Sequence, residues 1–470
     1  MSRIGAIVLA AGTSSRFGGS KLLARLGTRS ILQCVLDSVA GATLDPVVVV
    51  LGRDAEAIEQ AIAWRDERRL VNPAPEAGLS GSVWLAFQAL ANLRPPIDAA
   101  IVLLGDQPLV TADILGVIAG RPLDPAHPMV VPRYADGANP NPMRLERAAW
   151  PLVDGMTGDR GLGPLVAARP DLVREVPFDR LNPDVDTHAD LAALAWAERV
   201  IANRDQVDRC REVPDAADFY APLTARFVDD PRRTDDEVLD VLRGLVRHDD
   251  VLLDIGAGAG RYALPLALIA REVVAIDPSD GMLAALRGAM DDHGIRNVRT
   301  VSGRWPIPGW PPPDVPPADV ALIANVGYDI AEIGPFLDAM EANAERLCVA
   351  VLMERQPSSI AAPFWPPIHG EARVPLPALD DFVALLEARG TPAEVTRLER
   401  PPRGFPDRSS LSDFVRGQLW LSPGGEKDHL LQELLDPEMV SGEGGVRLRD
   451  QRTFRVGVVR WAPPHVLGGP

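Results

Sequence analysis

The chain has 470 residues, of which 46% are hydrophobic and 24% are charged. This length exceeds what one hydrophobic core usually organises, so two or three domains are expected. The formal net charge of −17 argues against a nucleic acid or an anionic membrane as the main partner. The three cysteines are far apart and favour neither a disulfide framework nor a thiolate metal site. The longest apolar runs are too short to span a bilayer and no signal-peptide pattern is present, which predicts a cytoplasmic protein without a membrane partner.

The first half of the chain, from Ile4 to about Leu194, alternates apolar runs with amphipathic stretches. Residues 4–10, 46–52 and 99–105 predict buried strands, because they are short, apolar and rich in β-branched side chains. Residues 31–39, 55–64 and 83–93 have the spacing of helices that cover a sheet. This alternation predicts an α/β domain with a parallel sheet.

A glycine-rich segment, LAAGTSSRFGGSK (Leu9–Lys21), follows the first predicted strand. A strand that ends in such a loop before a helix directs several backbone N–H groups at one point, and small side chains allow phosphates to approach them. Arg16 and Lys21 add positive charge, which suits a triphosphate that loses pyrophosphate. The loop is not of the Walker type, because Lys21 is not part of a Gly-Lys-Ser/Thr sequence. An ordinary glycine turn with two solvated cations is the alternative.

Three more segments continue this pattern: NPAPEAGLSGS (Asn72–Ser82), VLLGDQP (Val102–Pro108) and VDTHADL (Val185–Leu191). Together with the loop they resemble the motifs of MobA-like nucleotidyltransferases, in the same order, over about residues 4–194. The resemblance implies a Rossmann-like domain of the GT-A-like nucleotidyltransferase type. It also implies the following site residues: catalytic Arg16, Lys21 and Asp106, and nucleotide-binding Leu9, Ala10, Ala11, Gly12 and Ser80.

The pair Ala10-Ala11 and the sequence GDQP resemble the cytidylyltransferase branch of this family, which acts in molybdenum cofactor biosynthesis. The resemblance therefore implies CTP as the nucleotide and molybdopterin as the acceptor, with a molybdoenzyme or its maturation factors as further partners. The expected reaction is attack by the terminal phosphate oxygen of molybdopterin on the α-phosphorus of CTP, with release of pyrophosphate. Alignment and charge stabilisation would catalyse this step without a protein nucleophile.

Two aspartates are candidate ligands of a Mg²⁺ ion. Asp106 follows an apolar strand, which is where open α/β sheets bind ligands, and its carboxylate can hold an ion that bridges triphosphate oxygens. Asp186 is the second ligand that the family resemblance implies. Each aspartate has a structural alternative as a helix cap, and the neighbouring Thr187 and Asp190 support that alternative for Asp186.

The region expected to bind the acceptor departs from the family pattern. Pro140-Asn141-Pro142 replaces Gly-Asn-Pro, and Gly161-Leu162-Gly163 stands where Gly-Ala-Arg is frequent. Another phosphorylated small molecule, such as a sugar phosphate, is therefore the alternative acceptor.

A second alternating series begins after a polar, helical segment that ends near Val213-Pro214-Asp215. The predicted domains are residues 1–200 and 218–470, joined by a helical linker at 201–217. A second α/β domain is predicted by strand runs at residues 251–258, 272–279, 298–303, 319–326 and 347–353 and by helices at 262–270 and 281–290. The expected fold class is thus α/β, with two doubly wound Rossmann-like domains in tandem.

The segment VLLDIGAGAGRYALPLA (Val251–Ala267) has the form of a strand, a glycine loop and a helix. Asp277 ends the next strand, where its carboxylate can accept hydrogen bonds from ribose hydroxyls. A dinucleotide site is an alternative for such a loop. The sequence DIGAGAG and the following PSDGML closely resemble class I S-adenosylmethionine-dependent methyltransferases, over about residues 219–461. The resemblance implies S-adenosylmethionine as the cofactor and the following binding residues: Asp254, Gly256, Gly258, Gly260, Asp277 and Arg304.

The sequence does not identify the methyl acceptor, because methyl transfer from a sulfonium needs proximity and linear geometry more than an acid or a base. Trp305 can stack on adenine or pack in the core. Asn325 and Tyr328 can face a substrate or form structural hydrogen bonds, and His369 is expected at the surface rather than as a base.

Three proline-rich segments, at residues 306–317, 363–367 and 401–406, are expected to form rigid loops over the second site. A regulatory module that binds S-adenosylmethionine without transferring its methyl group is the alternative function of this half.

Overall fold

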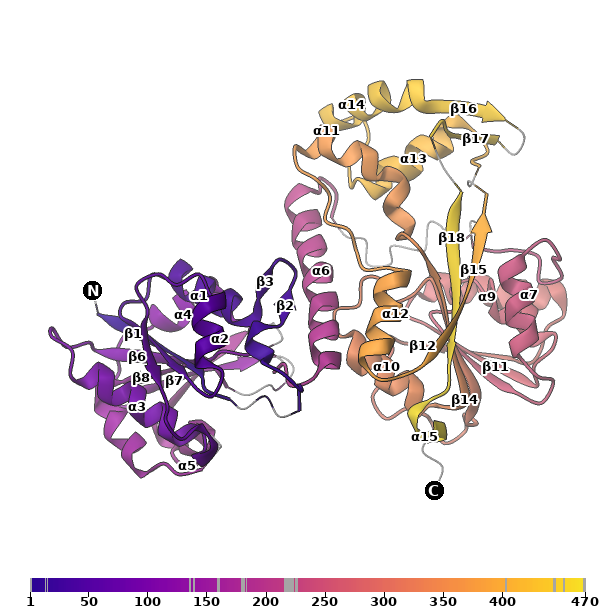
Figure 1. The fold of residues 1–470 in the computed structure, drawn as a ribbon. Helices are drawn as coiled ribbons and strands as arrows, with labels where there is room; N and C mark the ends of the chain where they lie inside the picture. Colours follow the sequence, from indigo (N-terminus) through magenta and orange to yellow (C-terminus); the bar gives the residue numbers. More distant parts are fainter. Residues whose placement is uncertain are drawn as a thin grey trace. The chain divides into compact units, whose positions relative to one another are not determined.

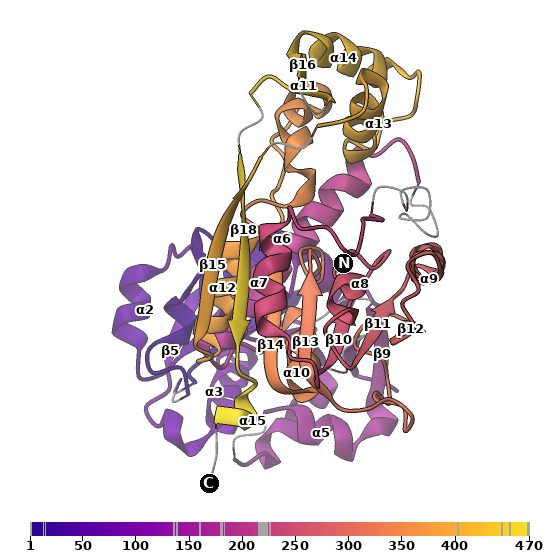
Figure 2. The same ribbon diagram turned by 90° about the vertical axis from the view of Figure 1, so that its right-hand side faces the viewer.

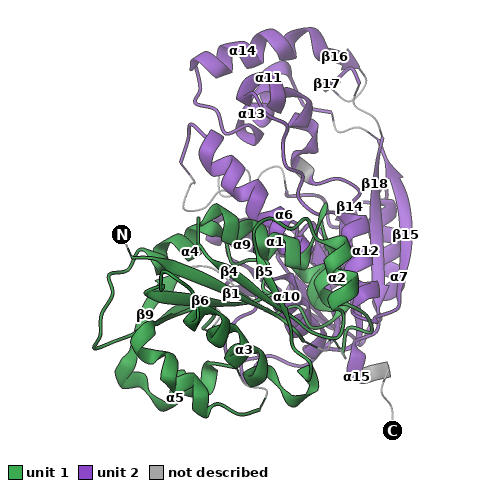
Figure 3. Ribbon diagram, turned by 60° about the vertical axis from the view of Figure 1, so that its left-hand side comes forward, with its two compact units in different colours: residues 1–194 green, residues 195–470 purple. Residues whose placement is uncertain are grey.

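The computed structural model divides into two compact units, Met1–Leu194 and Ala195–Pro470, which are green and purple in Figure 3. It describes all residues except 1, 13, 15, 135–136, 138–139, 159–160, 179–181, 183, 215–223, 225–226, 402–403, 443–444, 451–452 and 468–470. The expected start of the second domain, at residue 218, lies outside the described residues. Within the described part of the chain, no helix is both long enough and apolar enough to cross a membrane.

The first unit is built on a seven-stranded sheet (Figure 1). Its strands lie in the order β5 (Arg68–Val71), β4 (Val47–Leu51), β1 (Ile4–Ala10), β6 (Ala99–Leu104), β8 (Met143–Glu146), β7 (Met129–Tyr134) and β9 (Val173–Phe178). β8 runs antiparallel to β6 and β7, and the other neighbouring pairs are parallel. The sheet is therefore mixed, not parallel throughout as expected. The connection between β7 and β8, residues 135–142, is too short for the crossover that a parallel pair needs.

Helices cover both faces of this sheet. They are α1 (Ile31–Gly41), α2 (Ala55–Ala61), α3 (Leu79–Ala91), α4 (Ala112–Ala119) and α5 (Gly163–Ala168). Shorter elements are the 3-10 helices η1 (Lys21–Leu23), η2 (Pro75–Ala77), η3 (Arg147–Gly155) and η4 (Pro170–Leu172) and the strands β2 (Arg25–Leu26) and β3 (Arg29–Ser30). Ala6 and Val8 of β1 pack in one core with α1, α2 and α4, whereas Ile7 and Leu9 pack in another core with α3. Burial on both faces explains why β1 is apolar without interruption.

The second unit has its own seven-stranded sheet. Its order is β12 (Val298–Ser302), β11 (Glu272–Asp277), β10 (Val251–Ile255), β13 (Ala318–Ala324), β14 (Ala344–Met353), β18 (Phe454–Trp461) and β15 (Ala393–Arg400). β18 is antiparallel to β14 and β15, and the other neighbouring pairs are parallel. The carboxyl ends of β10, β11, β13 and β14 therefore meet at one edge, together with the end of β15. Both units thus have the α/β, Rossmann-like architecture that the sequence predicts.

Helices flank this sheet on two sides (Figure 1). The helices are α6 (His188–Cys210), α7 (Glu237–Leu245), α8 (Ala263–Ala267), α9 (Asp280–His293), α10 (Ile333–Ala342), α12 (Leu379–Ala388) and the terminal α15 (Pro464–Leu467). α7, α8 and α9 share a core with one face of the sheet, which Figure 2 views from the side of α7. α10 and α12 lie on the opposite side.

A group of elements after β14 and β15 forms a small structure with a hydrophobic core of its own. We call it the cap, and it consists of η6 (Pro357–Phe364), α11 (Trp365–His369), α13 (Arg408–Gln418), α14 (Glu426–Leu435), η7 (Asp436–Glu438), β16 (Met439–Gly442) and β17 (Gly445–Leu448). Trp365, Leu411 and Leu431 are fully buried at its centre. β15 ends and β18 begins on the cap side (Figure 1). The cap therefore lies at the carboxyl ends of the parallel strands.

The part of α6 in the second unit is held by hydrogen bonds to the segment that precedes α12. Arg199 donates from Nη2 to the carbonyl of Leu376 at 3.0 Å, and Asn203 donates to the carbonyl of Val374. The buried Gln206 donates to Ala372 at 2.8 Å and accepts from the N–H of Val374 at 2.7 Å. The residues expected as a helical linker are thus helical to Cys210 and attached to the second unit.

Residues 306–317 form a loop without helix or strand, as expected, whereas residues 363–367 do not. Residues 363–367 lie within η6 and α11 of the cap. Residues 306–317 replace the crossover helix between β12 and β13, and Trp310 and Val315 line a small cavity with Leu253 and Val274 of the sheet. Proline lacks the N–H that a helix interior needs, so this segment packs as an irregular layer. Residues 401–406 lie partly outside the described residues, and Phe405 pairs with Val446 of the cap.

Candidate active sites

The glycine-rich loop of the first unit leaves the carboxyl end of β1 and leads to η1. Ala10 and Ala11 are buried where the strand ends. A Cβ atom added at Gly12, Gly18 or Gly19 would meet no atom within 4 Å, so the backbone borders open space. Residues 13 and 15 lie outside the described residues. The described part of the loop thus has the open backbone that close approach of phosphates requires.

Lys21 is the centre of an ion-pair cluster at this edge. Its Nζ lies 2.5 Å from Oδ2 of Asp106 and 3.0 Å from Oδ1 of Asp186. Arg16, from the exposed part of the loop, lies 2.6 Å from Oδ2 of Asp186. Burial opposes the charged form of Lys21, but Asp106 and Asp186 together raise its pKa. The chain contains two lysines, and its other permanently charged cationic side chains are arginines. Lys21 therefore provides a compact ammonium group, which is rare among the cationic side chains of this chain.

Close packing at the end of β6 fixes the position of Asp106. The N–H of Gly105 donates to the carbonyl of Leu9 at 2.9 Å, and a side chain at Gly105 would crowd that carbonyl. Burial raises the pKa of Asp106, and nearby Asp184 adds to the effect while Lys21 opposes it. A cation that replaces the lost solvation is therefore favoured at this carboxylate.

Two further residues support the site and were not among the predicted site residues. Gln107 is fully buried and donates from Nε2 to Oδ1 of Asp184 at 2.7 Å, which joins the segment after β6 to the segment before α6. Both residues stand in or beside quoted motifs, Gln107 in VLLGDQP and Asp184 just before VDTHADL. Their positions in or beside these motifs could have identified both residues as candidates from the sequence. The contact between them forms only when the chain folds.

The helix-cap alternative for Asp186 is excluded because Thr187, the residue before α6, caps this helix: its Oγ1 accepts from the N–H of Asp190 at 3.1 Å. Oδ2 of Asp190 accepts hydrogen bonds from the N–H groups of Asp186 at 3.0 Å and Thr187 at 2.8 Å. The carboxylate of Asp186 instead contacts Lys21 and Arg16. Asp186 is therefore available to bind a cation.

The two aspartates fit a magnesium ion that is completed by the substrate. Among the described residues, no group of three or more His, Cys, Asp or Glu side chains could hold a metal. Asp106 and Asp186 nevertheless approach one shared cation, the Lys21 ammonium. Mg²⁺ is usually bound by one or two carboxylates together with phosphate oxygens and waters. The geometry thus suits an ion that binds with a triphosphate.

The segment with Ser80 is held beside this site by its own polar contacts. Asn72 donates from Nδ2 to Oγ of Ser82 at 2.9 Å and accepts from the N–H of Ala74 at 3.0 Å. The N–H of Ser80, in the first turn of α3, donates to the carbonyl of Gly158 at 3.2 Å. These contacts order the segment that the sequence predicts to bind the nucleotide.

The expected acceptor region is described in part. The carbonyl of Asn141 accepts from the hydroxyl of Tyr134 at 2.8 Å and from Nδ2 of Asn182 at 3.1 Å. Gly161 has a φ of +55°, and a Cβ there would lie 2.8 Å from Leu79. Residues 138–139 and 159–160 lie outside the described residues.

The second site is the glycine loop after β10. Gly256, Gly258 and Gly260 all have positive φ. A Cβ at Gly256 would lie 2.4 Å from Val326, whereas a Cβ at Gly258 would enter open space. Gly258 thus marks where a ligand can approach the backbone, and Gly256 is required for packing.

Asp254 and Asp277 lie at the ends of β10 and β11 on either side of this loop. Asp277 accepts from the N–H of Gly258 and the N–H of Ser279, each at 2.8 Å, and so fixes the loop. Asp254 is buried, and its Oδ1 has no hydrogen-bond partner among the described residues. A buried carboxylate oxygen without a donor is costly, and the amino group of S-adenosylmethionine is a donor of the required kind. The loop and the two aspartates therefore fit this cofactor.

Asp254 predicts a pH dependence of stability. Burial, with a contribution from Asp277, raises its pKa from 3.8 to about 7. The folded protein then keeps a proton that the unfolded chain releases above pH 4, so the stability falls as the pH rises toward 7. We expect Asp254→Asn to remove this fall, so that its free energy of unfolding gains on the order of 3 kcal/mol over wild type between pH 4 and pH 8.

Calorimetry of the full chain measures this difference in the unfolding transition that S-adenosylmethionine shifts. Asp292→Asn, at an exposed position of α9, controls for the loss of a charge. Parallel stability curves for wild type and Asp254→Asn would contradict the prediction.

The other predicted residues of the second site have different environments. Arg304 is exposed just after β12. Trp305 is buried, and its indole N–H donates to the carbonyl of Phe336 at 3.3 Å, which supports the packing alternative. The exposed Asn325, with a φ of +58°, follows β13. Tyr328 is buried and accepts from the N–H of Met353 at 2.6 Å, so it has a structural role.

His369 is half-buried rather than fully exposed at the surface. Its ring lies 4.2 Å from that of Trp365 in the cap, and its Nε2 lies 3.2 Å from the carbonyl of Leu419. Burial lowers the pKa of His369. The aromatic packing of the cap, which the sequence pattern did not reveal, accounts for this position.

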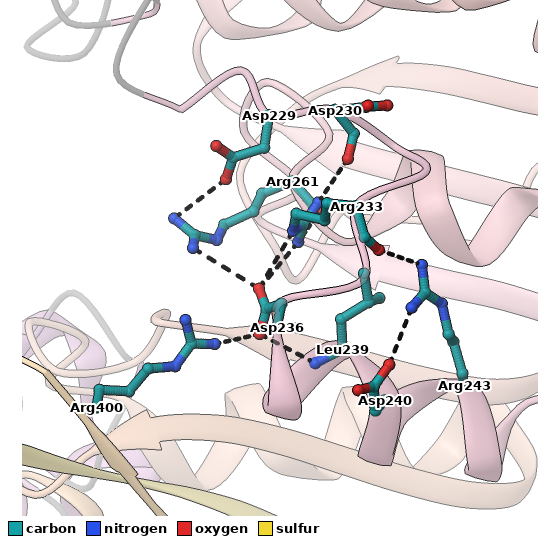
Figure 4. A network of polar contacts seen from close by, with 9 residues as sticks. All are labelled: Asp229, Asp230, Arg233, Asp236, Leu239, Asp240, Arg243, Arg261 and Arg400. Carbon is teal, nitrogen blue, oxygen red and sulfur yellow. Dashed lines mark hydrogen bonds and ion pairs between the residues drawn. The ribbon is translucent and has the colours of Figure 1, made fainter.

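An arginine cluster around Asp236 connects the glycine loop to two other elements (Figure 4). Asp236 is buried and lies 3.2 Å from Arg233 and 3.8 Å from Arg261, which follows Gly260. It also pairs with Arg400 at the end of β15 and caps α7 by accepting from the N–H of Leu239 at 3.2 Å. Burial opposes ionisation, but Arg400 and the other donors lower the pKa of Asp236.

Loss of Asp236 is therefore expected to destabilise the second unit. Asp236→Ala would leave three arginines without their shared carboxylate and α7 without its cap, at a cost of about 3–5 kcal/mol. Asp240→Ala removes a more exposed contact with Arg243 on the same helix and is expected to cost less than about 1 kcal/mol. Urea unfolding followed by tryptophan fluorescence compares the two variants, and equal effects would contradict the central role of Asp236.

Comparison with known proteins gives two family matches. Residues 6–173 match the model of the MobA-like NTP transferase domain, and residues 252–334 match the model of a methyltransferase domain. Among curated proteins, the chain is similar to the Bifunctional protein GlmU of Saccharophagus degradans, with 31% identity over 132 residues, and of Sinorhizobium medicae, with 36% identity over 110 residues. These matches cover 28% and 23% of this chain and 28% and 24% of the relatives, so the chain spans about a quarter of their length.

Among solved structures, the chain is similar to Rv0371c from Mycobacterium tuberculosis H37Rv, with 33% identity, a TM-score of 0.37, and coverage of 40% of this chain and 95% of that chain. It is also similar to Precorrin-6y C5,15-methyltransferase from Geobacter metallireducens GS-15, with 16% identity, a TM-score of 0.30, and coverage of 51% and 95%. From the two family matches, the chain contains a MobA-like NTP transferase domain in its first unit and a methyltransferase domain in its second.

Proposed function

We propose that the first unit transfers CMP from CTP to molybdopterin and releases pyrophosphate. The observation that carries this proposal is the Lys21 ammonium, held between Asp106 and Asp186 beside an open glycine-rich loop. The choice of CTP rests on the resemblance of Ala10-Ala11 and GDQP to cytidylyltransferases. A Cβ at Gly52 would lie 2.6 Å from the carbonyl oxygen of Ala11, so the two backbones pack closely where β1 ends. Small residues thus shape the end of β1, where we place the base.

In the proposed reaction, a phosphate oxygen of the acceptor forms a bond to the α-phosphorus. The bond from that phosphorus to the oxygen bridging the β-phosphate breaks, and pyrophosphate leaves with the electron pair. Bound Mg²⁺, held by Asp106 and Asp186, would neutralise charge on the triphosphate. Lys21 and Arg16 add positive charge, and the N–H groups of the loop orient the phosphates.

Binding and product analysis test this proposal. Calorimetry with CTP, GTP and ATP in the presence of Mg²⁺ is expected to show tightest binding of CTP. Incubation with CTP and molybdopterin, analysed by mass spectrometry, is expected to give the cytosine dinucleotide. A product formed only with a sugar phosphate would establish the alternative acceptor, and a preference for GTP or ATP would contradict the nucleotide assignment.

We further propose that the second unit transfers the methyl group of S-adenosylmethionine to a small molecule. The carrying observation is the buried, unpartnered Oδ1 of Asp254 at the glycine loop. When bound, the cofactor supplies an electrophilic methyl carbon. The acceptor atom would bond to this carbon while the carbon–sulfur bond breaks and its electron pair stays on sulfur. The proton of the acceptor would pass to water. Asp254 would bind the amino-acid end of the cofactor, Asp277 the ribose hydroxyls, and Gly258 allows close approach.

Radiolabelled cofactor tests methyl transfer. The purified protein, incubated with methyl-labelled S-adenosylmethionine and small-molecule extracts, is expected to yield a labelled product. Binding of the cofactor without label in any product would favour the regulatory alternative.

A further inference from the structure

The second unit contains a cavity of about 340 Å³ that neither site described above uses. Residues 354–356 of its wall directly follow β14, and residues 359–363 belong to η6 of the cap. The cavity therefore lies at the carboxyl edge of the sheet. β14 neighbours β13, which neighbours β10 and its glycine loop. Since adjacent strands are about 4.8 Å apart, the cavity begins roughly 10 Å from the candidate cofactor site.

The charged residues of the wall are unequally neutralised. They are Arg199, Arg355, Arg373, Glu354 and Asp381. The carboxylate of Asp381 already has partners: it forms an ion pair with Arg199, and it accepts from the N–H of Ala378 at 2.9 Å at the start of α12. Within the described residues, neither Arg355 nor Arg373 forms an ion pair with a carboxylate. Among the described residues, Glu354 of the wall also forms no ion pair, so three arginines face two carboxylates and the cavity keeps a net positive charge in an otherwise strongly acidic chain.

Arg373 is the more desolvated of the two. Its guanidinium lies 4.6 Å from the ring centroid of Trp365 and donates from Nη1 to the carbonyl of Gln418 at 3.1 Å. Its Nε is buried without a hydrogen-bond partner among the described residues. Burial lowers the pKa of Arg373 to about 10. A cation held in this way is costly unless an anion joins it, and a guanidinium binds carboxylates and phosphates in a two-pronged geometry.

We propose that this cavity binds the methyl acceptor and that the acceptor is a small anion with a carboxylate or phosphate group, held by Arg355 and Arg373. The assignment rests on the methyl-transfer function proposed above. The volume suits a small molecule, because ligand pockets of this kind measure about 300–1,000 Å³. Arg373 lies against Trp365 of the cap, whereas Arg355 follows β14 at the carboxyl edge of the sheet.

Probe binding to the full-length chain tests the cavity. Calorimetry uses phenyl phosphate, benzoate and the neutral benzamide, with S-adenosylhomocysteine present and with CTP and Mg²⁺ added to occupy the first unit. The two anions are expected to bind at least about tenfold more tightly than benzamide, because each forms charge-assisted hydrogen bonds. The tighter of the two anions identifies a phosphate or a carboxylate as the recognised group.

Two variants locate the binding. Arg355→Gln and Arg373→Gln are each expected to weaken binding of the preferred anion by at least about tenfold, because each removes a charge-assisted hydrogen bond. Arg447→Gln changes an exposed arginine of the cap and is expected to have no effect. If Arg373→Gln does not fold, the exposed Arg355 decides the question.

The outcomes separate this proposal from the function on which it rests. Absence of anion binding, or binding that both variants leave unchanged, would overturn the acceptor pocket. A separate titration with S-adenosylmethionine reports on the cofactor site, and its failure would contradict methyl transfer even where the anions bind.

Discussion

Replacing Lys21 with glutamine is expected to lower the rate of nucleotidyl transfer by about 10²–10³-fold, the effect of removing one charged group that stabilises a transition state. Lys21 places a nearly buried ammonium between Asp106 and Asp186, where charge on the triphosphate must be neutralised. Lys21→Arg is expected to recover little of the rate, because a planar guanidinium cannot occupy the space of a compact ammonium 2.5 Å from Asp106. Release of pyrophosphate from CTP with Mg²⁺ and the acceptor measures both variants.

The second lysine of the chain provides the control. Lys427 lies in α14 of the cap, in the other unit, and Lys427→Gln removes the same charge without touching the nucleotide site. Its nucleotidyl transfer is expected to equal that of wild type. A Lys21→Gln variant with more than about a third of wild-type activity would exclude the catalytic role, since a stabilising charge contributes tenfold or more.

Replacing Gly258 with leucine is expected to abolish measurable binding of S-adenosylmethionine, with a dissociation constant raised at least about 100-fold by the lost backbone approach. Gly258 has a φ of +56° and borders open space, and its N–H is fixed by Asp277. A leucine side chain would enter the space that the cofactor needs. Calorimetric titration of the full chain with S-adenosylmethionine measures the loss.

A leucine at Gly294 serves as a control that distinguishes lost cofactor binding from backbone strain. Gly294 also has a positive φ, of +68°, and open surroundings, but it lies at the end of α9 as a helix cap. Gly294→Leu is expected to cost a similar 1–2 kcal/mol of backbone strain, roughly, while it leaves cofactor binding unchanged. Equal affinities of the two variants for S-adenosylmethionine would contradict the placement of the cofactor at Gly258.

The strands and most helices near the two sites follow from local patterns. Uninterrupted apolar runs mark β1 and β10 because helices cover both faces of these strands. The ends of helices are predicted less accurately. α8 ends at Ala267, whereas the predicted helix extends to residue 270, and α3 begins at Leu79, whereas the predicted helix begins at residue 83. Hydrophobic spacing marks the buried side of a helix, whereas its ends depend on caps and on tertiary contacts.

The departures from the expected fold arise where partners are far apart in the chain. β8 and β18 turn antiparallel, and the cap assembles from segments on both sides of β15. Of the proline-rich segments predicted as loops, residues 363–367 are helical, and residues 306–317 are a loop that takes the place of a crossover helix. Their packing surfaces come from distant residues, so local sequence could not assign them.

The motifs alone predict which strand ends carry chemistry: glycines that permit close approach to the backbone, and aspartates that follow buried strands. This information is local, because a loop conformation and a strand end depend on a few consecutive residues. Three features arise only on folding: the sharing of Lys21 by Asp106 and Asp186, the buried carboxylate oxygen of Asp254 without a donor, and the arginines of the cavity. Their electrostatics depend on burial and on neighbours from other segments of the chain, which set the solvation and pairing of each charge.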